Sequence, residues 1–514
     1  MNTNKIIAAA AIGLCSLTAL SAWAQTEKYV EISTKGQYIT CPASDINYIS
    51  VFDQLTPPTN VTATYSDGKI HLSWDEVEGA TSYNIFYSCD RDYAYPYPPY
   101  LESSKAPYEY NVTDTRYTFN VSSILNPRLG GIIYFYISAN GEGRRSEFSD
   151  VARVTIGESP ITVGTLCGYK LADDSQGTVY GPFETASGFN YEGSMAFDPL
   201  YPNRLYIAYD GYPNYGEIVQ LDLETNTHTL LMSKSKFENK RVRNCAFTKD
   251  GQYMLVSTDR DDNGYKSPSV WIVKRNDDGT FSDESSMKLL AAYKQCNCVA
   301  VHPVNGEVYF TSYSGGEVFR IDIDNYFSTV NESKEWDQSC FDCLFSVMDP
   351  SWEISISIHP SGNYAYLNCI NRGCIYRTDY DWNKKKFTTP YPVIGGGKKG
   401  FMDGESYSAE IQRPYQGVFV KNSKYSGELD EYDYYFTDTY NFCVRALSPM
   451  RKTLRTITGR APYDDGNLWG TEDGNGFEAR FRDITGLAYD ENTKTFYVLD
   501  HNNRRIRTIT IKSR

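Results

Sequence analysis

Aromatic residues recur in polar loops of this 514-residue chain, beside Asp, Asn and Arg. An aromatic face can stack on the CH groups of a sugar, while amides, carboxylates and guanidinium groups bind its hydroxyls. If the fold gathers these loops on one side, they would form a carbohydrate-binding surface. The candidates, with one histidine in the same kind of loop, are Tyr212, Tyr215, Tyr265, Tyr313, Trp336, Trp352, Tyr440, Trp469 and His501. The alternative is that several of these rings only pack loops together.

Residues suited to catalysis are few. The chain has five histidines, and His302 and His359 lie in matching His-Pro turns, which favours a structural role. His501 is the candidate general base, but no nucleophile or metal ligand accompanies it. The neighbouring acids Glu472 and Asp473 could serve a glycosidase, yet they lie in a turn-rich connection. We therefore expect a protein without catalytic activity, with a lyase or glycosidase as an alternative.

The chain also contains the first half of a calcium-binding loop. Asp259, Asp261 and Asn263, followed by Gly264, read Asp-x-Asp-x-Asn-Gly. The position that should carry the bidentate acid is Val270, and no helix pattern flanks the loop. We expect a polar hairpin turn here, with calcium as the alternative. The cysteine and histidine spacing matches no zinc pattern, so no cofactor is predicted.

The elements that must position these loops follow a repeat. From about residue 158 onward, six segments share a strand, a turn, a second strand, a polar turn and a third strand. Equivalent core positions recur at separations of roughly 50 to 70 residues; they are Phe197, Phe247, Val301, Ile358, Val420 and Tyr489. A small sheet cannot bury both faces alone, so this period indicates a six-bladed β-propeller. We predict that Ile161 to Cys167 adds the outer strand of the last blade and closes the ring.

Two of the repeats share a shorter phrase, Asp-x-x-Asn-x-x-aliphatic-Arg. It reads DTYNFCVR from Asp438 and DHNNRRIR from Asp500. We expect the Asp to end the second strand, the Asn to take the left-handed turn position, and the Arg to lie in the third strand as a structural contact. The phrase therefore predicts architecture, and it places Tyr440 and His501 in loops of one face.

Two family resemblances refine this interpretation. The glycine-rich linkers VIGGGKKGFMDGESYSAEIQ and GTEDGNGFEARF make residues 158–514 resemble NHL-repeat propellers, a family that mostly binds proteins, RNA or glycans. Residues 57–157 resemble a fibronectin type III domain through Pro57-Pro58, Trp74, ATSYNIFY and YFYISA. The implied fold class is all-β: a fibronectin type III-like sandwich followed by a six-bladed NHL-type β-propeller.

The N-terminus predicts export. Residues 1–24 have Lys5, an apolar run and a small-x-small site ending at Ala24, which is typical of a secretory signal peptide. Lipidation of Cys15 is the alternative. Residues 25–56 alternate around a Thr-Lys-Gly-Gln turn and predict a short β-hairpin module. No later stretch is long and apolar enough to predict a transmembrane segment.

Composition limits the partners. A formal net charge of −14 disfavours nucleic acid, because phosphate binding needs a concentrated basic surface. We expect an exported, non-catalytic protein of a Gram-negative bacterium, in the periplasm, at the cell surface or secreted. Its partner would be a polysaccharide or oligosaccharide, as in bacterial glycan-utilisation systems. The alternative is a protein–protein interaction scaffold of the cell envelope.

Overall fold

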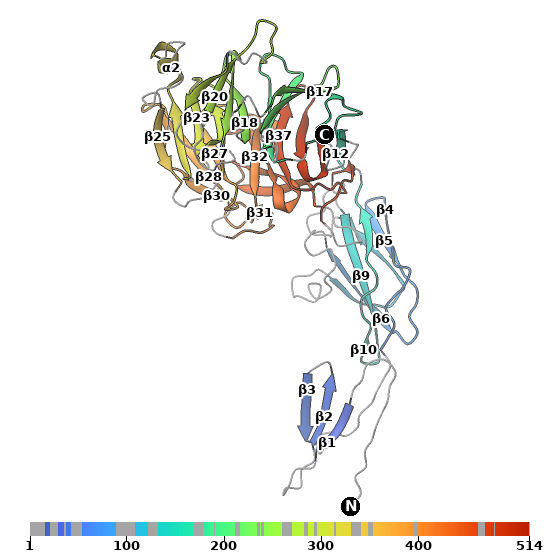
Figure 1. Cartoon of the computed structure of the whole chain (residues 1–514). Helices are drawn as coiled ribbons and strands as arrows, with labels where there is room; N and C mark the ends of the chain where they lie inside the picture. The colour runs from blue at the N-terminus through green and yellow to red at the C-terminus, as the bar shows by residue number, and fades with distance from the viewer. Residues whose placement is uncertain are drawn as a thin grey trace, which may run out of the picture.

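The computed structural model is an almost entirely β structure with several antiparallel sheets (Figure 1). It describes residues 16–20, 29–34, 37–42, 54–88, 108–121, 132–157, 159–168, 178–189, 191–210, 216–233, 237, 241–259, 270–281, 286–291, 296–312, 315–329, 341–347, 353–394, 398–460, 468–476 and 478–512. Among these residues, no helix is long and apolar enough to cross a membrane.

The first sheet has three antiparallel strands, β1 (Ser16–Leu20), β2 (Tyr29–Thr34) and β3 (Gln37–Pro42). The pairing of β2 with β3 closes with Thr34 opposite Gln37, at the turn that the sequence predicts. β1 lies within the residues that we expect to form a signal peptide, and it pairs with β2.

Two further sheets form a sandwich. One contains β4 (Thr62–Ser66), β5 (Lys69–Ser73) and β8 (Arg116–Asn120); the other contains β6 (Ser82–Ser88), β7 (Tyr108–Val112), β9 (Ile132–Gly141), β10 (Arg144–Arg145) and β11 (Ala152–Thr155). Ile70 and Leu72 from the first sheet share one core with Ile85 and Phe135 from the second. Trp74, directly after β5, is 5% exposed and packs edge-on against Tyr83. The sequence pattern placed this tryptophan correctly inside the sandwich.

Six sheets make up the propeller, and in each the strands follow one another outwards from the inner strand. The first has β14 (Gly193–Phe197), β15 (Arg204–Tyr209), β16 (Glu217–Asp222), β17 (Thr227–Met232) and β13 (Gly181–Pro182). The second has β18 (Val242–Phe247), β19 (Tyr253–Thr258), β20 (Val270–Lys274) and β21 (Lys288–Ala291). The third has β22 (Cys296–Val301), β23 (Val308–Ser312), β24 (Glu317–Ile321) and β25 (Phe341–Ser346), with helix α2 (Ile323–Thr329).

The remaining three blades follow the same order. The fourth has β26 (Ile354–Ile358), β27 (Tyr364–Cys369), β28 (Cys374–Asp381), β29 (Lys386–Phe387) and β30 (Tyr391–Ile394). The fifth has β32 (Pro414–Lys421), β33 (Tyr432–Asp438), β34 (Cys443–Ser448), β35 (Thr453–Gly459) and β31 (Gly404–Glu405), with the short 3-10 turns η6 (Ser423–Tyr425) and η7 (Thr439–Asn441). The sixth has β37 (Ile484–Asp490), β38 (Thr495–Asp500), β39 (Arg505–Ile511), β12 (Ile161–Cys167) and β36 (Gly474–Asn475), with η8 (His501–Asn503).

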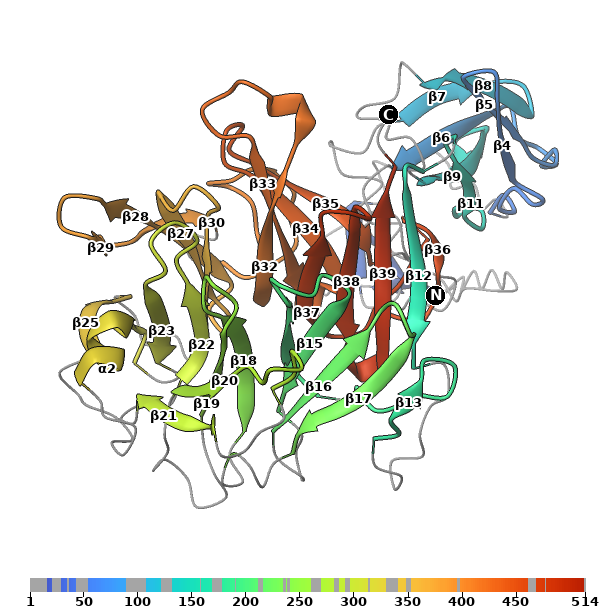
Figure 2. The ribbon, with the colours of Figure 1, turned by 90° about the horizontal axis from the view of Figure 1, so that it is seen from above.

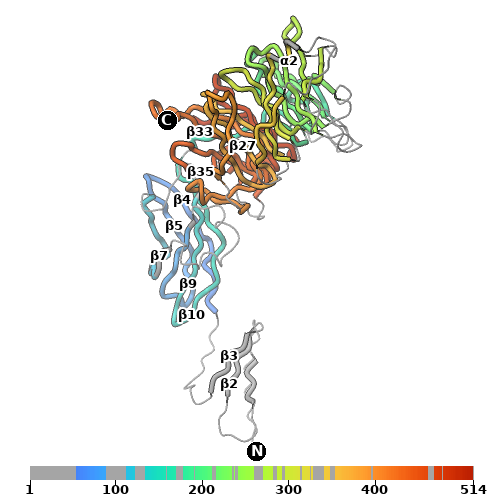
Figure 3. The backbone as a smooth tube through the Cα atoms, turned by 90° about the vertical axis from the view of Figure 1, so that its left-hand side faces the viewer, coloured from blue at the N-terminus to red at the C-terminus, as the bar shows by residue number. Residues whose placement is uncertain are grey.

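The ring closes as the sequence predicts. β12, which precedes the first blade in the chain, pairs antiparallel with β39 from Ile161 opposite Ile511 to Cys167 opposite Ile506. This pairing joins the two ends of the ring in one sheet and leaves β39 no open edge. Figures 2 and 3 show the sandwich beside the propeller, and in Figure 2 it lies next to the blade that contains β12 and β39. The Thr155 hydroxyl lies 3.3 Å from Glu478 across this junction.

Side-chain hydrogen bonds connect the inner strands of neighbouring blades. Gln416 of β32 accepts hydrogen bonds from the backbone N–H groups of Met195 and Leu487, each at 2.9 Å, and donates one to the Met195 carbonyl. It therefore binds the fifth, sixth and first blades to one another. The other fasteners between neighbouring inner strands include Asn244 to Ser194 and Val299, Asn297 to Ile354, Ser355 to Tyr415, and Ser357 to Gly417. These contacts satisfy polar groups at inner-strand edges that no neighbouring strand pairs.

The repeated phrase is a hairpin fastener, as predicted. Asp438 ends β33, and its carboxylate accepts hydrogen bonds from the Gln412 and Arg413 backbone, the Asn441 amide and the Arg445 guanidinium. Arg445 is fully buried and also donates to the Glu410 carbonyl in the linker that precedes β32.

The second copy repeats these contacts. Asp500 accepts from the Arg482 backbone, the Asn503 amide and Arg507, at 2.8 to 2.9 Å. One expectation was wrong: the left-handed position is held by Phe442 (φ 56°) and Arg504 (φ 55°), one residue after each Asn. The Asn instead lies inside the 3-10 turn, because its amide is needed to join the Asp to a linker carbonyl.

The two His-Pro turns are structural, as expected. His302 is buried and its Nε2 is hydrogen-bonded to the Gly362 carbonyl of the next blade at 3.0 Å. His359 stacks on Tyr364, and its Nε2 lies 3.3 Å from Asp430. Each ring therefore connects one blade to the next.

Candidate functional site

The candidate surface is the end of the propeller where inner strands begin and second strands end, which we call the top face. Of the predicted site residues, Tyr440, Trp469 and His501 are described by the structure. The others lie outside the described residues, and they are Tyr212, Tyr215, Tyr265, Tyr313, Trp336 and Trp352. The described part of the site therefore comprises loops of the fifth and sixth blades and the residues around the channel.

Among the described candidates, two aromatic side chains are exposed on this face. Tyr440 in η7 is 47% exposed, and the guanidinium carbon of Arg413 lies 5.1 Å from its ring centroid. Trp469, in the linker before β37, is 37% exposed, and the Arg482 guanidinium lies 4.4 Å from its ring. In each case a cation supports one face of an exposed aromatic ring. Such a pair offers an apolar surface beside hydrogen-bond donors.

His501, which the sequence predicted at the binding surface, is buried. Its ring is 7% exposed, and burial lowers its pKa below the usual range although the carboxylates of Glu192 and Asp483 act in the opposite direction. The ring is therefore neutral at physiological pH and points into the fold. Sequence reasoning placed it in the correct loop, η8, but could not show that the neighbouring blade covers it.

A ring of charged residues at the top of the channel was missed by sequence reasoning. In five blades the residue directly before the inner strand is charged, and these residues are Glu192, Arg241, Glu353, Arg413 and Asp483. The pattern is visible once the inner strands are aligned, because each position precedes an aligned apolar strand. Its meaning depends on the closed ring, which brings these positions together around one axis.

Three arginines and four carboxylates form a buried network here. Arg413 pairs with Glu192 at 2.6 Å and with Glu353 at 3.1 Å. Arg243, two residues into the second blade, reaches Glu353 at 2.8 Å and Asp210 at 3.2 Å. Arg241 pairs with Asp210 at 3.1 Å and with Asp259 at 2.5 Å, and Arg243 also lies 3.6 Å from Asp259 and 4.0 Å from Glu192. The Arg243 side chain is 1% exposed and lies across the upper end of the central channel.

The network sets the protonation of its acids. Burial opposes ionisation of Glu192, but Arg413 and then Arg243 outweigh it and lower its pKa to about 2. Burial raises the pKa of Asp210 above its usual range, against the opposing effect of Arg243 and Arg241. The guanidinium groups donate their hydrogen bonds to these carboxylates. The network is therefore suited to holding the blades in place rather than to moving protons.

Asp259, the first residue of the candidate calcium loop, binds an arginine. The Asp259 carboxylate is fully buried and accepts two hydrogen bonds from Arg241, at 2.8 and 2.5 Å. Asp261 and Asn263 lie outside the described residues. Within the described part of the chain, no group of three or more His, Cys, Asp or Glu residues is arranged to hold a metal ion.

Comparisons with known proteins support the fold. No protein-family model matches the chain. Two curated relatives are each 25% identical: "Protein SUPPRESSOR OF QUENCHING 1, chloroplastic" of Arabidopsis thaliana over 218 residues, and "NHL repeat-containing protein 2" of Gallus gallus over 115 residues. These matches cover 41% and 22% of this chain, and the chain spans only 19% and 14% of the length of these relatives.

Solved structures match nearly the whole chain. An "auxiliary nutrient binding protein" of Bacteroides thetaiotaomicron is 28% identical, with a TM-score of 0.60, and the match covers 90% of this chain and 100% of that one. A second protein of that organism, described as a "putative phosphatase", is 36% identical with a TM-score of 0.66, over 90% of this chain and 97% of its own. On the strength of this last match, the chain belongs to the same family as that Bacteroides propeller protein.

Proposed function

We propose that this chain is an exported, non-catalytic binding protein whose propeller binds a polysaccharide or oligosaccharide on its top face. The observation that carries the proposal is the pair of exposed rings, Tyr440 and Trp469, each with an arginine stacked beneath it. A sugar can stack on the free face of such a ring while the nearby polar groups bind its hydroxyls. The related "auxiliary nutrient binding protein" supports a binding role.

The charged network supports binding over phosphate hydrolysis, although one family member is described as a "putative phosphatase". Arg241 and Arg243 each direct their Nε, Nη1 and Nη2 groups at protein oxygens. Four carboxylates also outnumber the three guanidinium groups. A phosphate would meet a net negative cluster in which two of the three arginines have no free fork of donors.

The other parts of the chain fit export and presentation. Residues 1–24 would be removed as a signal peptide, and the fibronectin type III-like sandwich of residues 57–157 would act as a spacer that holds the propeller of residues 158–514 away from its anchor or partner. Amino-terminal sequencing of the protein recovered from the cell envelope would test cleavage after Ala24. A mature chain that begins at residue 1 would contradict it.

The binding proposal is tested by affinity electrophoresis of the full-length mature protein in gels that contain single polysaccharides. We expect at least one polysaccharide to retard the protein, and Trp469→Ala or Tyr440→Ala to weaken binding roughly tenfold, as expected for loss of one aromatic stacking contact. Tyr391→Ala is the matched control, because Tyr391 is 45% exposed but lies on the outer strand β30. Retardation by no polysaccharide, or equal loss in the Tyr391 variant, would contradict the proposal.

If the top face instead binds a protein, the same variants would weaken capture of an envelope protein and leave polysaccharide retardation absent. That outcome would favour the interaction-scaffold alternative.

A further inference from the structure

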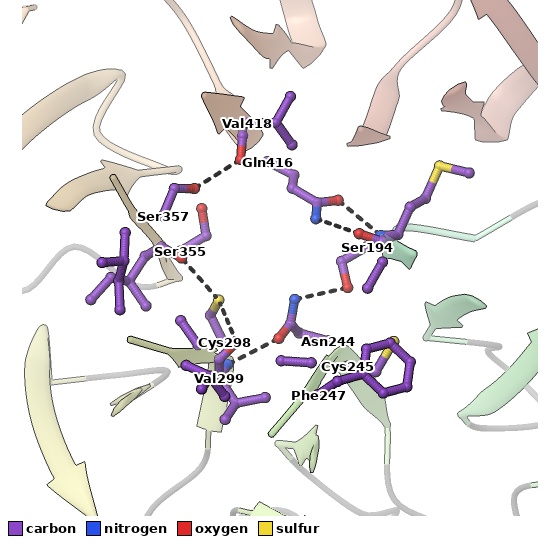
Figure 4. A pocket seen from close by; sticks show the side chains of 18 of the residues that line it. Ser194, Asn244, Cys245, Phe247, Cys298, Val299, Ser355, Ser357, Gln416 and Val418 are labelled. Carbon is purple, nitrogen blue, oxygen red and sulfur yellow. Dashed lines mark hydrogen bonds between the residues drawn. The ribbon is translucent and has the colours of Figure 1, made fainter. Parts of the chain in front are cut away.

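An arginine crosses the central channel at its upper end. A cavity of about 550 Å³ is lined by the inner strands of the first five blades. Figure 4 shows side chains from these strands arranged around it. At the top, Arg243 crosses from the second blade to Glu353 of the fourth and also donates to Asn297 at 3.2 Å. At the other end, which we call the bottom face, the cavity is bordered by the turns that follow the inner strands.

The channel is wide because small residues recur at one position. The residue one before the aligned core position is Ala196, Ala246, Ala300 and Ser357 in the first four blades, and all four line the cavity. Each is only partly buried, so the channel wall is accessible to solvent. A cavity of this volume is in the range of small-molecule sites.

The lining is amphipathic, and its buried charge, Arg243, is paired. Hydroxyl and amide groups come from Ser194, Asn244 and Gln416, which also form the hydrogen bonds between inner strands described above, while Phe247 and Val299 supply apolar surface (Figure 4). Arg243 and Lys249 are the charged lining residues. Arg243 is ion-paired to Asp210 and Glu353, and the Lys249 ammonium donates to the Val304 carbonyl at 2.6 Å. In the buried part of the channel, away from the exposed Lys249, a charged ligand would therefore lose its hydration without gaining a free counter-ion.

Exposed apolar side chains lie on the bottom face, near the turns that follow the inner strands. Leu200 and Tyr201 follow Pro199, a lining residue, and are 47% and 37% exposed. Val304 follows Pro303, a second lining residue, and is 43% exposed. Trp382, 45% exposed, lies near the same turn, with its ring 5.6 Å from that of His302. Apolar surface at Leu200 and Val304 therefore directly follows two lining prolines on the bottom face.

We propose that the channel is a second binding site, separate from the top face, and that it takes the end of a neutral oligosaccharide. Alternating CH surfaces and hydroxyls of an uncharged sugar match the mixed lining. Because Arg243 closes the top, a chain can enter only by its end. The choice of ligand class rests on the proposed function, but the residues that carry the site are different ones.

The test uses isothermal titration of the full-length mature protein with maltotriose, cellotriose and mannotriose. Two further probes isolate the two claims: trigalacturonate carries negative charge, and α-cyclodextrin has the glucose linkage of maltotriose but no chain end. We expect at least one neutral trisaccharide to bind, and trigalacturonate and α-cyclodextrin to bind at least tenfold more weakly than it does. Filling the channel with Ala246→Leu and Ala300→Leu should weaken trisaccharide binding at least tenfold, while Trp469→Ala should leave it unchanged.

A crystal soaked with the trisaccharide that binds provides a readout that does not depend on the folding of a variant. We expect sugar density between Ser194 and Ser357. The proposal is overturned if no neutral trisaccharide binds, if trigalacturonate or α-cyclodextrin binds equally well, or if the sugar lies on the top face. Retained polysaccharide retardation that depends on Trp469 would, in each of these cases, leave the proposed function standing.

Discussion

Replacing His228 should change how the stability of the propeller depends on pH. His228 lies in β17 of the first blade, is 1% exposed, and packs between Tyr180 and Phe189 with ring centroids 5.0 and 4.6 Å apart. Burial lowers its pKa to about 4, and the backbone of Val179 only partly opposes this. The ring is therefore neutral in the folded protein at a pH where the unfolded chain would already be protonated.

The magnitude follows from the two pKa values. An unfolded histidine has a pKa of about 6.5, so the shift of about 2.5 units corresponds to roughly 3.4 kcal/mol in total. Because the folded pKa is the lower one, stability is complete above pH 6.5 and is lost as the pH falls from 6.5 towards 4. At pH 5 the loss relative to pH 8 is about 2 kcal/mol.

The assay is equilibrium urea unfolding of the wild type, His228→Phe and His228→Leu at pH 8, 6.5, 5 and 4.5. Other groups titrate alike in all three proteins, so their effect cancels in the difference. We expect the wild type to lose about 2 kcal/mol more than either variant between pH 8 and pH 5. A difference that stays constant with pH, or that grows in favour of the wild type in acid, would refute the reasoning.

Three further predictions concern the fasteners of the ring. Asp438→Asn and Asp500→Asn should each cost about 1–3 kcal/mol in urea unfolding, because each fully buried arginine loses one of its two carboxylate partners and keeps only Asp403 or Asp473; a loss in only one copy would contradict the equivalence of the two phrases. Gln416→Ala should cost about 1–3 kcal/mol, since two backbone N–H groups lose their acceptor, and an unchanged melting temperature would show that the contact is dispensable. Glu192, with its pKa lowered to about 2, should support stability above pH 4.5 and lose that contribution as the pH falls towards 2; Glu192→Gln should remove this part of the acid transition, and an unaltered acid profile would argue against it.

Local patterns in the sequence predicted the blades well. Phe197, Phe247, Val301 and Ile358 each end an inner strand, so aligning them found the first four blades. The phrase at Asp438 and Asp500 predicted two hairpins because all of its contacts but those to the linker lie within seven residues. Its one error, the left-handed position, arose because the role of the Asn depends on a linker carbonyl about 40 residues before it.

The site itself was less predictable, because it depends on contacts between distant residues. Arg413 and Glu192 are 221 positions apart, and they meet only because the ring closes through β12. The burial of His501 has the same origin, since Glu192 of the first blade lies beside it. The sequence could place Tyr440, Trp469 and His501 only in loops. In the closed ring, Tyr440 and Trp469 are exposed and His501 is buried.

The charged network links the architecture to both binding proposals. Arg243 reaches from the second blade to the fourth, so the ion pairs that hold the blades together also divide the channel from the top face. Removing a paired arginine would leave several carboxylates facing one another without a counter-charge, which would destabilise the ring. An apolar plug would avoid this cost, so a charged plug is favoured only if it also separates the two faces. Tyr440 and Trp469 then lie on one side of this plug and the lined cavity on the other. A ligand bound to one side can reach the other only if Arg243 leaves at least two carboxylates, and the pairing of Arg243 with both Asp210 and Glu353 opposes that movement.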